Sequence, residues 1–401
     1  MKALKWIGCA AFAAATWIPV ALADVITDWN EKACAIVGKV GPGGPGHRFM
    51  AIVQVSVYDA VSSITGSGKP YLAGIDAPRG ASVDAAVAAA NRTALLELMP
   101  GEKEAIESAY QAALAKLADG AAKTDGIAVG EKAARAVLAR AAADGANAAD
   151  TYMPHTSPGV YVPTMIPVST SWPKRKPWVM DRADQFRPGP PPALDSDTWA
   201  HDYKEVMLLG GKNSAQRSKE QTEIARFWEE TRPLVYHPVL RSVASMPGRT
   251  VAQNARFYAV ATVAVDDALI AIFDAKYTYN FWRPITAVRH GGGNKALAAE
   301  AGWTPFVNTP MHPEYPCAHC VSSGALGAVI EAELGATPPP VLSSSSPTAG
   351  GTVREWRTVA AFMEEVRMAR IYDGVHYRNS TEVGNDMGRK VGALAAERFG
   401  R

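Results

Sequence analysis

Apolar residues along much of this chain recur every three or four positions, which is the period of one face of an α-helix. Alternating runs rich in β-branched residues, which would predict strands, are almost absent. We therefore expect an all-α fold, a multi-helix bundle with more than four helices and long irregular loops. The predicted helical stretches are two helices within 31–63, one each over 83–117, 120–143, 197–210, 217–230 and 251–282, and others at about 318–335, 352–371 and 380–398.

Two stretches lack this period. Residues 151–196 are rich in Pro, Thr, Ser and Trp, and such a long segment is either a wall of a functional site or a simple linker. Residues 335–351, GATPPPVLSSSSPTAGG, have the composition of a disordered loop. We expect an N-terminal helical region at 24–150, the irregular segment at 151–196 and a helical core at 197–401, within one large domain.

The N-terminus has the pattern of a secretory signal peptide over residues 1–23. Lys2 and Lys5 precede an apolar run, and Ala21-Leu22-Ala23 forms a small-x-small cleavage signal before Asp24. An uncleaved membrane anchor is the alternative. The sequence therefore predicts a periplasmic or secreted protein with no stable membrane anchor after cleavage.

The charge balance argues against two classes of partner. The chain has 41 basic and 39 acidic residues, and loss of two lysines with the signal peptide would leave 39 of each. A neutral chain without basic runs is not typical of proteins that bind nucleic acid or anionic membranes. A small-molecule substrate is the remaining expectation, and the sequence does not indicate an oligomeric state.

Four cysteines give little basis for a structural metal site. Cys9 falls in the signal peptide, which leaves Cys34, Cys317 and Cys320 in an exported, oxidising compartment. A zinc site is not expected, because the sequence has no second CxxC and no C-x2-C with a downstream H-x3-H. A Cys317–Cys320 disulfide is an alternative, although three residues on a helix would strain it.

A first candidate for chemistry is the pair Lys276 and Arg283 in the helix predicted over 251–282. Seven residues bring them back within roughly 20° of each other on one helix face, and Pro284 then ends the helix. Two stacked cations suit a polyvalent anion, since Arg offers a planar fork and Lys a point charge. The alternative is a solvated helix face.

A second candidate is the helix that begins at Cys317 or Ala318. Its first-turn N–H groups have no helical acceptor and form a ready anion site. His319 lies in that first turn, where it could deliver a proton to a bound anion. The alternative is a core or capping histidine.

A third candidate joins Arg370 and His376, six residues apart. Asp373-Gly374 interrupts the helix, and Asn379 with Glu382 resembles a capping box at the start of the next one. A loop can therefore aim both side chains inward. The three candidates together suit an oxyanion, with one histidine as acid/base and another that attacks or ligates it.

The order and spacing of these motifs resemble a known three-part signature. The vanadium-dependent haloperoxidase and type 2 phosphatidic acid phosphatase superfamily has Lys-x6-Arg-Pro, Pro-Ser-Gly-His and Ser-Arg-x5-His. The segments RFMAIVQVSVYDAVSSI and GWTPFVNTPMHPEYP are also similar to the secreted bacterial haloperoxidase-like branch. The matching stretches here are Lys276-x6-Arg283-Pro284, Pro316-Cys317-Ala318-His319 and Arg370-x5-His376.

This resemblance implies a pocket for vanadate or phosphate in a helical bundle of the haloperoxidase and acid phosphatase type. A haloperoxidase would hold vanadate as cofactor and use peroxide and halide, whereas a phosphatase would need no cofactor and act on a phosphoester. A non-catalytic phosphate-binding relative is a third hypothesis. The roles implied are oxyanion binding by Lys276, Arg283, Arg370, the backbone N–H of Ala318 and the signature position of Cys317, acid/base catalysis by His319, and vanadium ligation or nucleophilic attack on phosphorus by His376.

The chain departs from the signature at several positions. Cys317 replaces Ser, Ala318 replaces Gly, and Ala369 replaces the Ser before the arginine. A thiol is a poorer hydrogen-bond donor than a hydroxyl, and peroxide would oxidise a thiolate that faces it. The departure at Cys317 therefore argues against peroxidase chemistry.

A further departure concerns the orientation of His376. Some phosphatases have Asp four residues after the last histidine, where this chain has Ser380. Loss of that carboxylate would weaken the orientation of the imidazole unless Asp373 or a backbone carbonyl replaces it.

Overall fold

The protein is described from a computed structural model, which covers residues 24–41, 45–72 and 75–399. The predicted signal peptide lies outside these residues. The regular secondary structure of the described part is almost all helix, as expected, and none of these helices is both long and apolar enough to span a bilayer. Its α-helices are α1 Val25–Val37, α2 Gly46–Thr65, α3 Val83–Leu98, α4 Lys103–Leu114, α5 Ala121–Ala142, α6 Asp197–Leu209, α7 Lys219–Phe227, α8 Pro233–Ala244, α9 Val251–Tyr279, α10 Pro284–Arg289, α11 Ala318–Leu334, α12 Val359–Tyr372 and α13 Arg378–Phe399.

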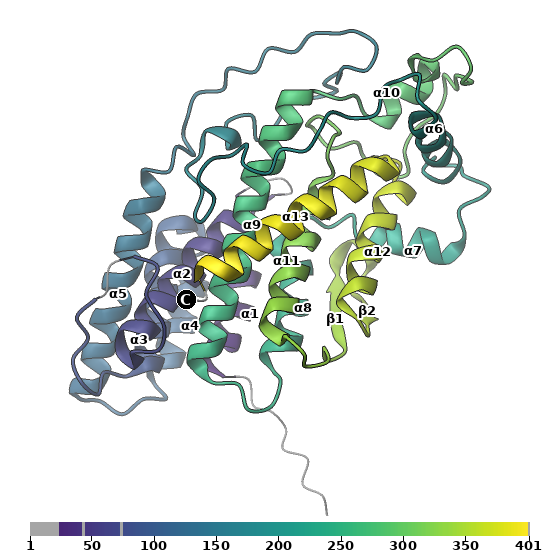
Figure 1. Cartoon of the computed structure of the whole chain (residues 1–401). Helices are drawn as coiled ribbons and strands as arrows, with labels where there is room; N and C mark the ends of the chain where they lie inside the picture. The colour runs from purple at the N-terminus through teal and green to yellow at the C-terminus, as the bar shows by residue number, and fades with distance from the viewer. Residues whose placement is uncertain (1–23, 42–44, 73–74, 400–401) are drawn as a thin grey trace, which may run out of the picture.

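The long helix α9 is the centre of the bundle (Figure 1). The N-terminal helices α1, α2 and α3 and the helix α5 lie on one side of it, and α11 and α13 pack against it from the other. Most of its residues are buried around its whole circumference, as expected of a helix surrounded by others. One cluster of buried apolar residues includes members of both the 24–150 and the 197–401 regions.

Helices α11 and α13 pack backbone against backbone because small residues line their contact. A Cβ added at Gly388 would collide with the carbonyl oxygen of Val321, and one at Gly384 would lie 2.6 Å from the carbonyl oxygen of Cys317. Only glycine allows so close an approach. The N-terminal ends of both helices are thereby held next to each other.

The irregular segment 151–196 is fixed on α9 by two buried aspartates. Asp266 accepts a bidentate ion pair from Arg175 at 2.8 and 2.7 Å. Asp267 accepts the backbone N–H groups of residues 178–180 at 2.7 to 3.0 Å. Of the two readings of this segment, the structure favours a wall over a loose linker.

Several helices differ from the predictions. The stretch predicted as one helix over 83–117 is interrupted by the short 3₁₀ turn Pro100–Glu102, because proline cannot continue a helix. Helix α8 was not predicted, since Pro238 interrupts its pattern. Helix α9 ends at Tyr279, where Asn280 adopts a left-handed conformation with φ of 50°.

A small hairpin replaces part of the predicted loop 335–351 and the first turn of the predicted helix 352–371. Strands β1 Leu342–Ser346 and β2 Thr352–Trp356 pair antiparallel, and α12 begins only at Val359. Packing against the rest of the protein stabilises the serine-rich strand β1. Leu342 and Ser344 are buried, and Ser344 Oγ donates to the Val235 carbonyl oxygen at 2.6 Å.

Candidate active site

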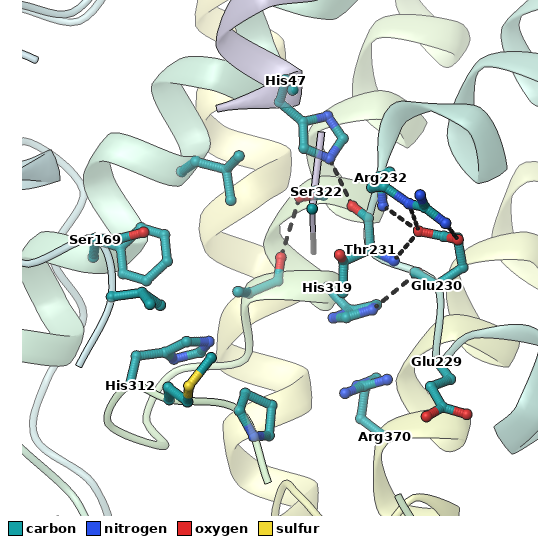
Figure 2. Close-up of a pocket in the computed structure, with 18 of the residues that line it drawn as sticks. His47, Ser169, Glu229, Glu230, Thr231, Arg232, His312, His319, Ser322 and Arg370 are labelled. Carbon is teal, nitrogen blue, oxygen red and sulfur yellow. Dashed lines mark hydrogen bonds and ion pairs between the residues drawn. The ribbon is translucent and has the colours of Figure 1, made fainter. Parts of the chain in front are cut away.

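A cavity of about 420 Å³ brings the second and third candidate motifs together. Ala318 and His319 reach it from the start of α11, Arg370 from the end of α12, and His376 from the turn before α13. The loops before α8 and α11, the irregular segment, and residues of α2 and α9 contribute further parts of its wall. Figure 2 shows His319 and Arg370 on one side of the cavity, opposite Ser169.

His376 is held by a carboxylate that sequence reasoning missed. Its Nδ1 lies 2.7 Å from Glu314 Oε1, which also accepts the backbone N–H of Tyr377 at 3.2 Å. A carboxylate partner places the proton on Nδ1 and leaves the lone pair of the imidazole on Nε2. That Nε2 lies 3.2 Å from Arg283 Nη1. The imidazole is therefore oriented as a ligand or nucleophile.

Glu314 orients the His376 imidazole, a role that the serine at position 380 cannot take over from the missing aspartate. Neither Asp373 nor a backbone carbonyl replaces the missing aspartate, because Asp373 is paired with Arg370. Burial raises the pKa of Glu314 to about 7, against the opposing effect of Lys276 and Arg283. The only sequence signal for this role was an acid inside the HPEYP stretch before the second motif.

The first motif reaches the site in a different way from the one predicted. Lys276 and Arg283 do not share a helix face, because α9 ends at Tyr279 and Arg283 lies in extended backbone, with φ −80° and ψ 155°, as the N-cap of α10. Both side chains are nonetheless buried, at 0% and 1% exposure. The alternative of a solvated helix face is therefore wrong.

Both cations bind backbone carbonyl groups beside the cavity. Lys276 Nζ donates to the carbonyl oxygens of Pro313 and Glu314 at 3.0 and 2.6 Å. Arg283 Nη1 donates to the Val375 carbonyl oxygen at 2.7 Å. Burial and the neighbouring Arg283 lower the pKa of Lys276. Among the described residues that line the cavity neither cation occurs, so they support His376 and the loop before α11 from behind.

Arg370 lines the cavity and has one donor without a partner among the described residues. Its Nη1 donates to the Trp228 carbonyl oxygen at 2.7 Å and pairs with Asp373. Within the described part of the chain, its buried Nε has no hydrogen-bond partner. A buried donor without an acceptor is costly, so this guanidinium retains hydrogen-bonding capacity beside the cavity.

Cys317 has a different place from the oxyanion-binding one expected. It is the N-cap of α11, its Sγ accepts the backbone N–H of Cys320 at 3.3 Å, and it is fully buried. Burial acts to raise the pKa of this thiol, but the hydrogen bond with Cys320 and the charge of Arg370 lower it. Its side chain does not line the cavity and both cysteines are free thiols, so the disulfide alternative is not formed and the predicted conflict with peroxide is relieved.

His319 is positioned to exchange a proton with a ligand. It is a cavity residue on the first turn of α11, and its Nε2 lies 3.3 Å from the Glu230 carbonyl oxygen. Burial, with the charge of Arg370, lowers the pKa of His319 well below its usual value. The imidazole is therefore neutral at neutral pH, with Nδ1 as its basic nitrogen.

Two other histidines line the cavity and were not predicted. His312 Nδ1 lies 3.0 Å from Arg283 Nη2, and its ring meets Phe273 edge to face at 5.2 Å. His47 Nε2 donates to the Thr231 carbonyl oxygen at 2.9 Å. Both reach the cavity through contacts between segments that are distant in sequence.

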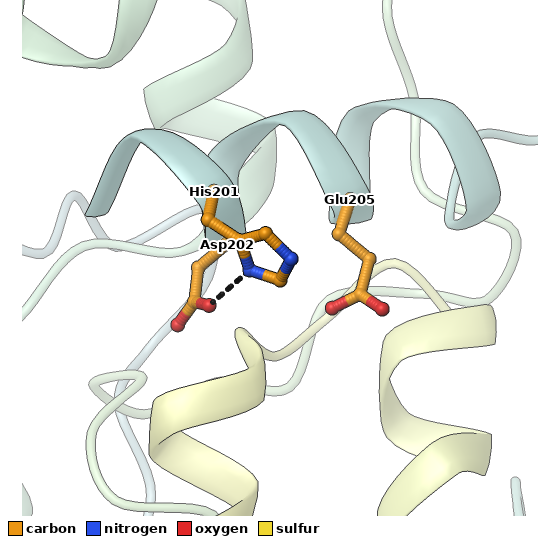
Figure 3. Close-up of side chains that lie close together, drawn as sticks. All are labelled: His201, Asp202 and Glu205. Carbon is orange, nitrogen blue, oxygen red and sulfur yellow. Dashed lines mark hydrogen bonds and ion pairs between the residues drawn. The ribbon is translucent and has the colours of Figure 1, made fainter. Parts of the chain in front are cut away.

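Figure 3 shows a cluster of His201, Asp202 and Glu205 on α6, none of which lines this cavity. Glu205 is paired with Arg378 at 2.5 Å, and Asp202 accepts the backbone N–H of Asn379 at 2.8 Å. The predicted capping box at Asn379 is therefore wrong, because α13 begins at Arg378 and a carboxylate from α6 satisfies its first turn.

Comparisons with known proteins agree with this geometry. A family model described as the VCPO second helical-bundle domain matches residues 256–401. Vanadium chloroperoxidase from Curvularia inaequalis is 29% identical over a stretch that covers 34% of this chain and 28% of that protein. The chain thus matches little more than a quarter of the length of that relative.

Solved structures extend the likeness in fold to nearly the whole chain. A bacterial vanadium-dependent iodoperoxidase superposes with a TM-score of 0.81 and 23% identity, over 94% of this chain and 96% of that one. A holo-type bacterial vanadium-dependent chloroperoxidase gives 0.77 and 17%, over 93% and 96%. The family match covers the helices that carry all three motifs, and together with the curated relative and the common fold it supports a relationship to the vanadium haloperoxidase superfamily.

Proposed function

We propose that this protein is a vanadium-dependent haloperoxidase, in which vanadate is bound at His376 and hydrogen peroxide oxidises a halide ion. The observation that carries the proposal is the orientation of His376. Its Nδ1 is engaged by Glu314, its Nε2 lies beside Arg283, and the same cavity is lined by Arg370, whose Nε has no partner in the part of the chain that the structure describes. The relationship to the superfamily supports the same reading.

The residues present fit a vanadate ion. Arg370 offers an unused buried donor, the first turn of α11 offers the backbone N–H groups of Ala318 and His319, and His376 offers a nitrogen lone pair. Arg283 and Lys276 add positive charge behind them. When bound, vanadate would supply a Lewis-acid centre that activates peroxide toward halide.

The side chains of this protein would then have separate tasks. His376 would hold the ion, with Glu314 fixing the ring and strengthening its basicity. Arg370 would neutralise charge on the oxyanion. His319, neutral and beside the anion, would accept and return protons through Nδ1. Halide oxidation by peroxide consumes one proton for each water formed, and His319 is the group placed to deliver it.

We also propose that the protein acts after export, in the periplasm or outside the cell. The support is the signal-like pattern at residues 1–23. Secretion of a tagged full-length chain, with N-terminal sequencing of the product, tests it. An uncleaved N-terminus on the mature protein would contradict it.

The test of activity uses one preparation. The purified protein is loaded with orthovanadate and given peroxide and iodide, and triiodide is followed by absorbance. We expect turnover in the wild type and none above background in His376→Ala. Equal rates in both proteins would refute the proposal.

An acid phosphatase is the second candidate, and the Glu314–His376 pair favours it as well. A carboxylate that orients the imidazole would also activate Nε2 as a phosphoryl nucleophile, with His319 protonating the leaving alcohol. Hydrolysis of an aryl phosphate at mildly acidic pH, inhibited by vanadate, would identify it. A protein that binds phosphate and shows neither activity would be the non-catalytic relative.

A further inference from the structure

The cavity is much larger than an oxyanion requires. A five-atom oxyanion occupies about 150 Å³ if each heavy atom takes roughly the volume of a water molecule, whereas the cavity measures about 420 Å³. Cavities of that size hold organic ligands in other proteins. The groups that suit an oxyanion, from α11, α12 and the turn before α13, occupy only part of the wall.

Another part of the wall is apolar and aromatic. The apolar wall is defined here as Val168, Trp172, Leu269, Phe273 and Met311. Leu269 and Phe273 are four residues apart and so share one face of α9. Trp172 meets Phe273 edge to face, with ring centroids 6.3 Å apart. None of these side chains carries a charge.

The segments that carry Val168 and Met311 of the apolar wall lie across the cavity from the catalytic groups. In Figure 2, Ser169 and His312, which adjoin Val168 and Met311 in sequence, lie opposite His319 and Arg370. A molecule that contacts the apolar wall would therefore present its other side to the site of oxidation.

The apolar wall is also held in place before any ligand binds. The backbone N–H of Val168 donates to the Met311 carbonyl oxygen at 2.8 Å, and the Tyr277 hydroxyl donates to the Val168 carbonyl oxygen. Ser169 lines the cavity with φ of 60°, a left-handed conformation that is uncommon for serine and costs energy. A preformed wall lowers the entropic cost of binding a ligand.

We propose, resting on the haloperoxidase function above, that the apolar wall binds an electron-rich aromatic acceptor and that halogenation takes place on that bound molecule. The ring would stack on or against Phe273 and Trp172, with a phenolic hydroxyl toward the polar side. The class of substrate is then a phenol or naphthol and not only the halide.

The chemistry balances with reactants already named. Peroxide removes two electrons from the halide, one aromatic C–H bond breaks, a C–halogen bond forms, and the ring proton passes to a base. Overall, the aromatic compound, hydrogen peroxide, halide ion and one proton give the halogenated product and two waters.

Two side chains of the apolar wall would themselves be damaged if no acceptor took up the electrophilic halogen. Met311 and Trp172 are both oxidisable, and free electrophilic halogen in the cavity would attack them; a methionine sulfoxide would make the wall polar. A bound acceptor between these side chains and the site of oxidation would react first.

The first experiment measures binding without turnover. Vanadate-free protein is titrated with 1-naphthol by calorimetry, and we expect saturable binding at one site. Phe273→Leu removes the ring face and should weaken binding at least threefold. Phe257→Leu, the same change on the same helix but away from the cavity, should not. Absence of saturable binding, or equal weakening by both substitutions, would overturn the proposal.

The second experiment needs no variant. 1-Naphthol reacts at C2 and C4, so the wild type with vanadate, peroxide and iodide is compared with reagent hypoiodite at the same pH. We expect the isomer ratio from the enzyme to differ at least threefold from the reagent ratio. An identical ratio alongside normal triiodide formation would refute the acceptor site alone. Failure to form triiodide would refute the proposed activity, and the calorimetric titration would still decide whether the wall binds the ring.

Discussion

Substitution of Glu314 by glutamine tests how the candidate site orients its key imidazole. Glutamine keeps the shape of the side chain and can still accept the Tyr377 N–H, but it removes the negative charge that faces His376 Nδ1 at 2.7 Å. Hydrogen bonds to charged groups contribute about 1.5–3 kcal/mol. At 1.4 kcal/mol for each tenfold change, we expect vanadate to bind roughly 10- to 100-fold more weakly, as is typical when a partner of a ligating histidine is lost.

The assay is equilibrium dialysis with orthovanadate and vanadium analysis, supported by thermal unfolding. A ligand that binds only the folded state stabilises it in proportion to the logarithm of its concentration over Kd, so a tenfold weaker Kd removes about 1.4 kcal/mol of that stabilisation under saturating conditions. Glu331→Gln, which changes a surface carboxylate paired with Arg389, is the matched control. A folded Glu314→Gln protein with a Kd within twofold of the wild type would refute the assigned role.

Three further predictions concern stability and reactivity. Gly388→Ala should lower the free energy of unfolding in urea by about 1–3 kcal/mol or more, because its Cβ would collide with Val321. The control Gly189→Ala, whose Cβ meets nothing within 4 Å, should change it little. Equal free energies of unfolding for the two variants would contradict the close contact. Burial raises the pKa of Asp59 from 3.8 to about 6, so the folded state binds this proton more tightly than the unfolded state does. The free energy of unfolding, relative to that of Asp59→Asn, should therefore decline by up to about 3 kcal/mol as pH rises from about 4 to 6. If urea titrations give the same difference in free energy between the two proteins at every pH, this prediction is contradicted. Cys317 should remain unoxidised when the native protein is treated with peroxide, and peptide mass spectrometry that finds it as sulfenic acid would contradict its shielded place.

Periodicity predicted most of the helices because it reflects which face of each helix is buried. It failed where tertiary contacts decide the local structure. The serine run of β1 has no apolar alternation, and its strand depends on the partner strand and on the contact of Ser344 with Val235. Arg283 was misplaced because nothing in the pattern marks the left-handed turn at Asn280.

The candidate site was predictable in its motifs but not in its connections. His319, Arg370 and His376 follow from the spacing of the motifs, and the structure places all three at one cavity. Glu314 lies 62 residues from His376 in sequence, and a pairing over that distance has no signature in a single chain. The role of Cys317 depends on which way an N-cap side chain turns, which residue type alone does not decide.

The glycine-lined contact between α11 and α13 has a consequence for how this site could change in evolution. The two backbones already touch, so neither helix can accept a larger side chain there or move closer. The distance between the start of α11, which carries His319, and the start of α13, which follows His376, therefore has a fixed width. Any new acceptor must therefore be accommodated from the opposite side. Side chains that the irregular segment contributes to the cavity can change without altering that width, so we expect specificity to diverge there.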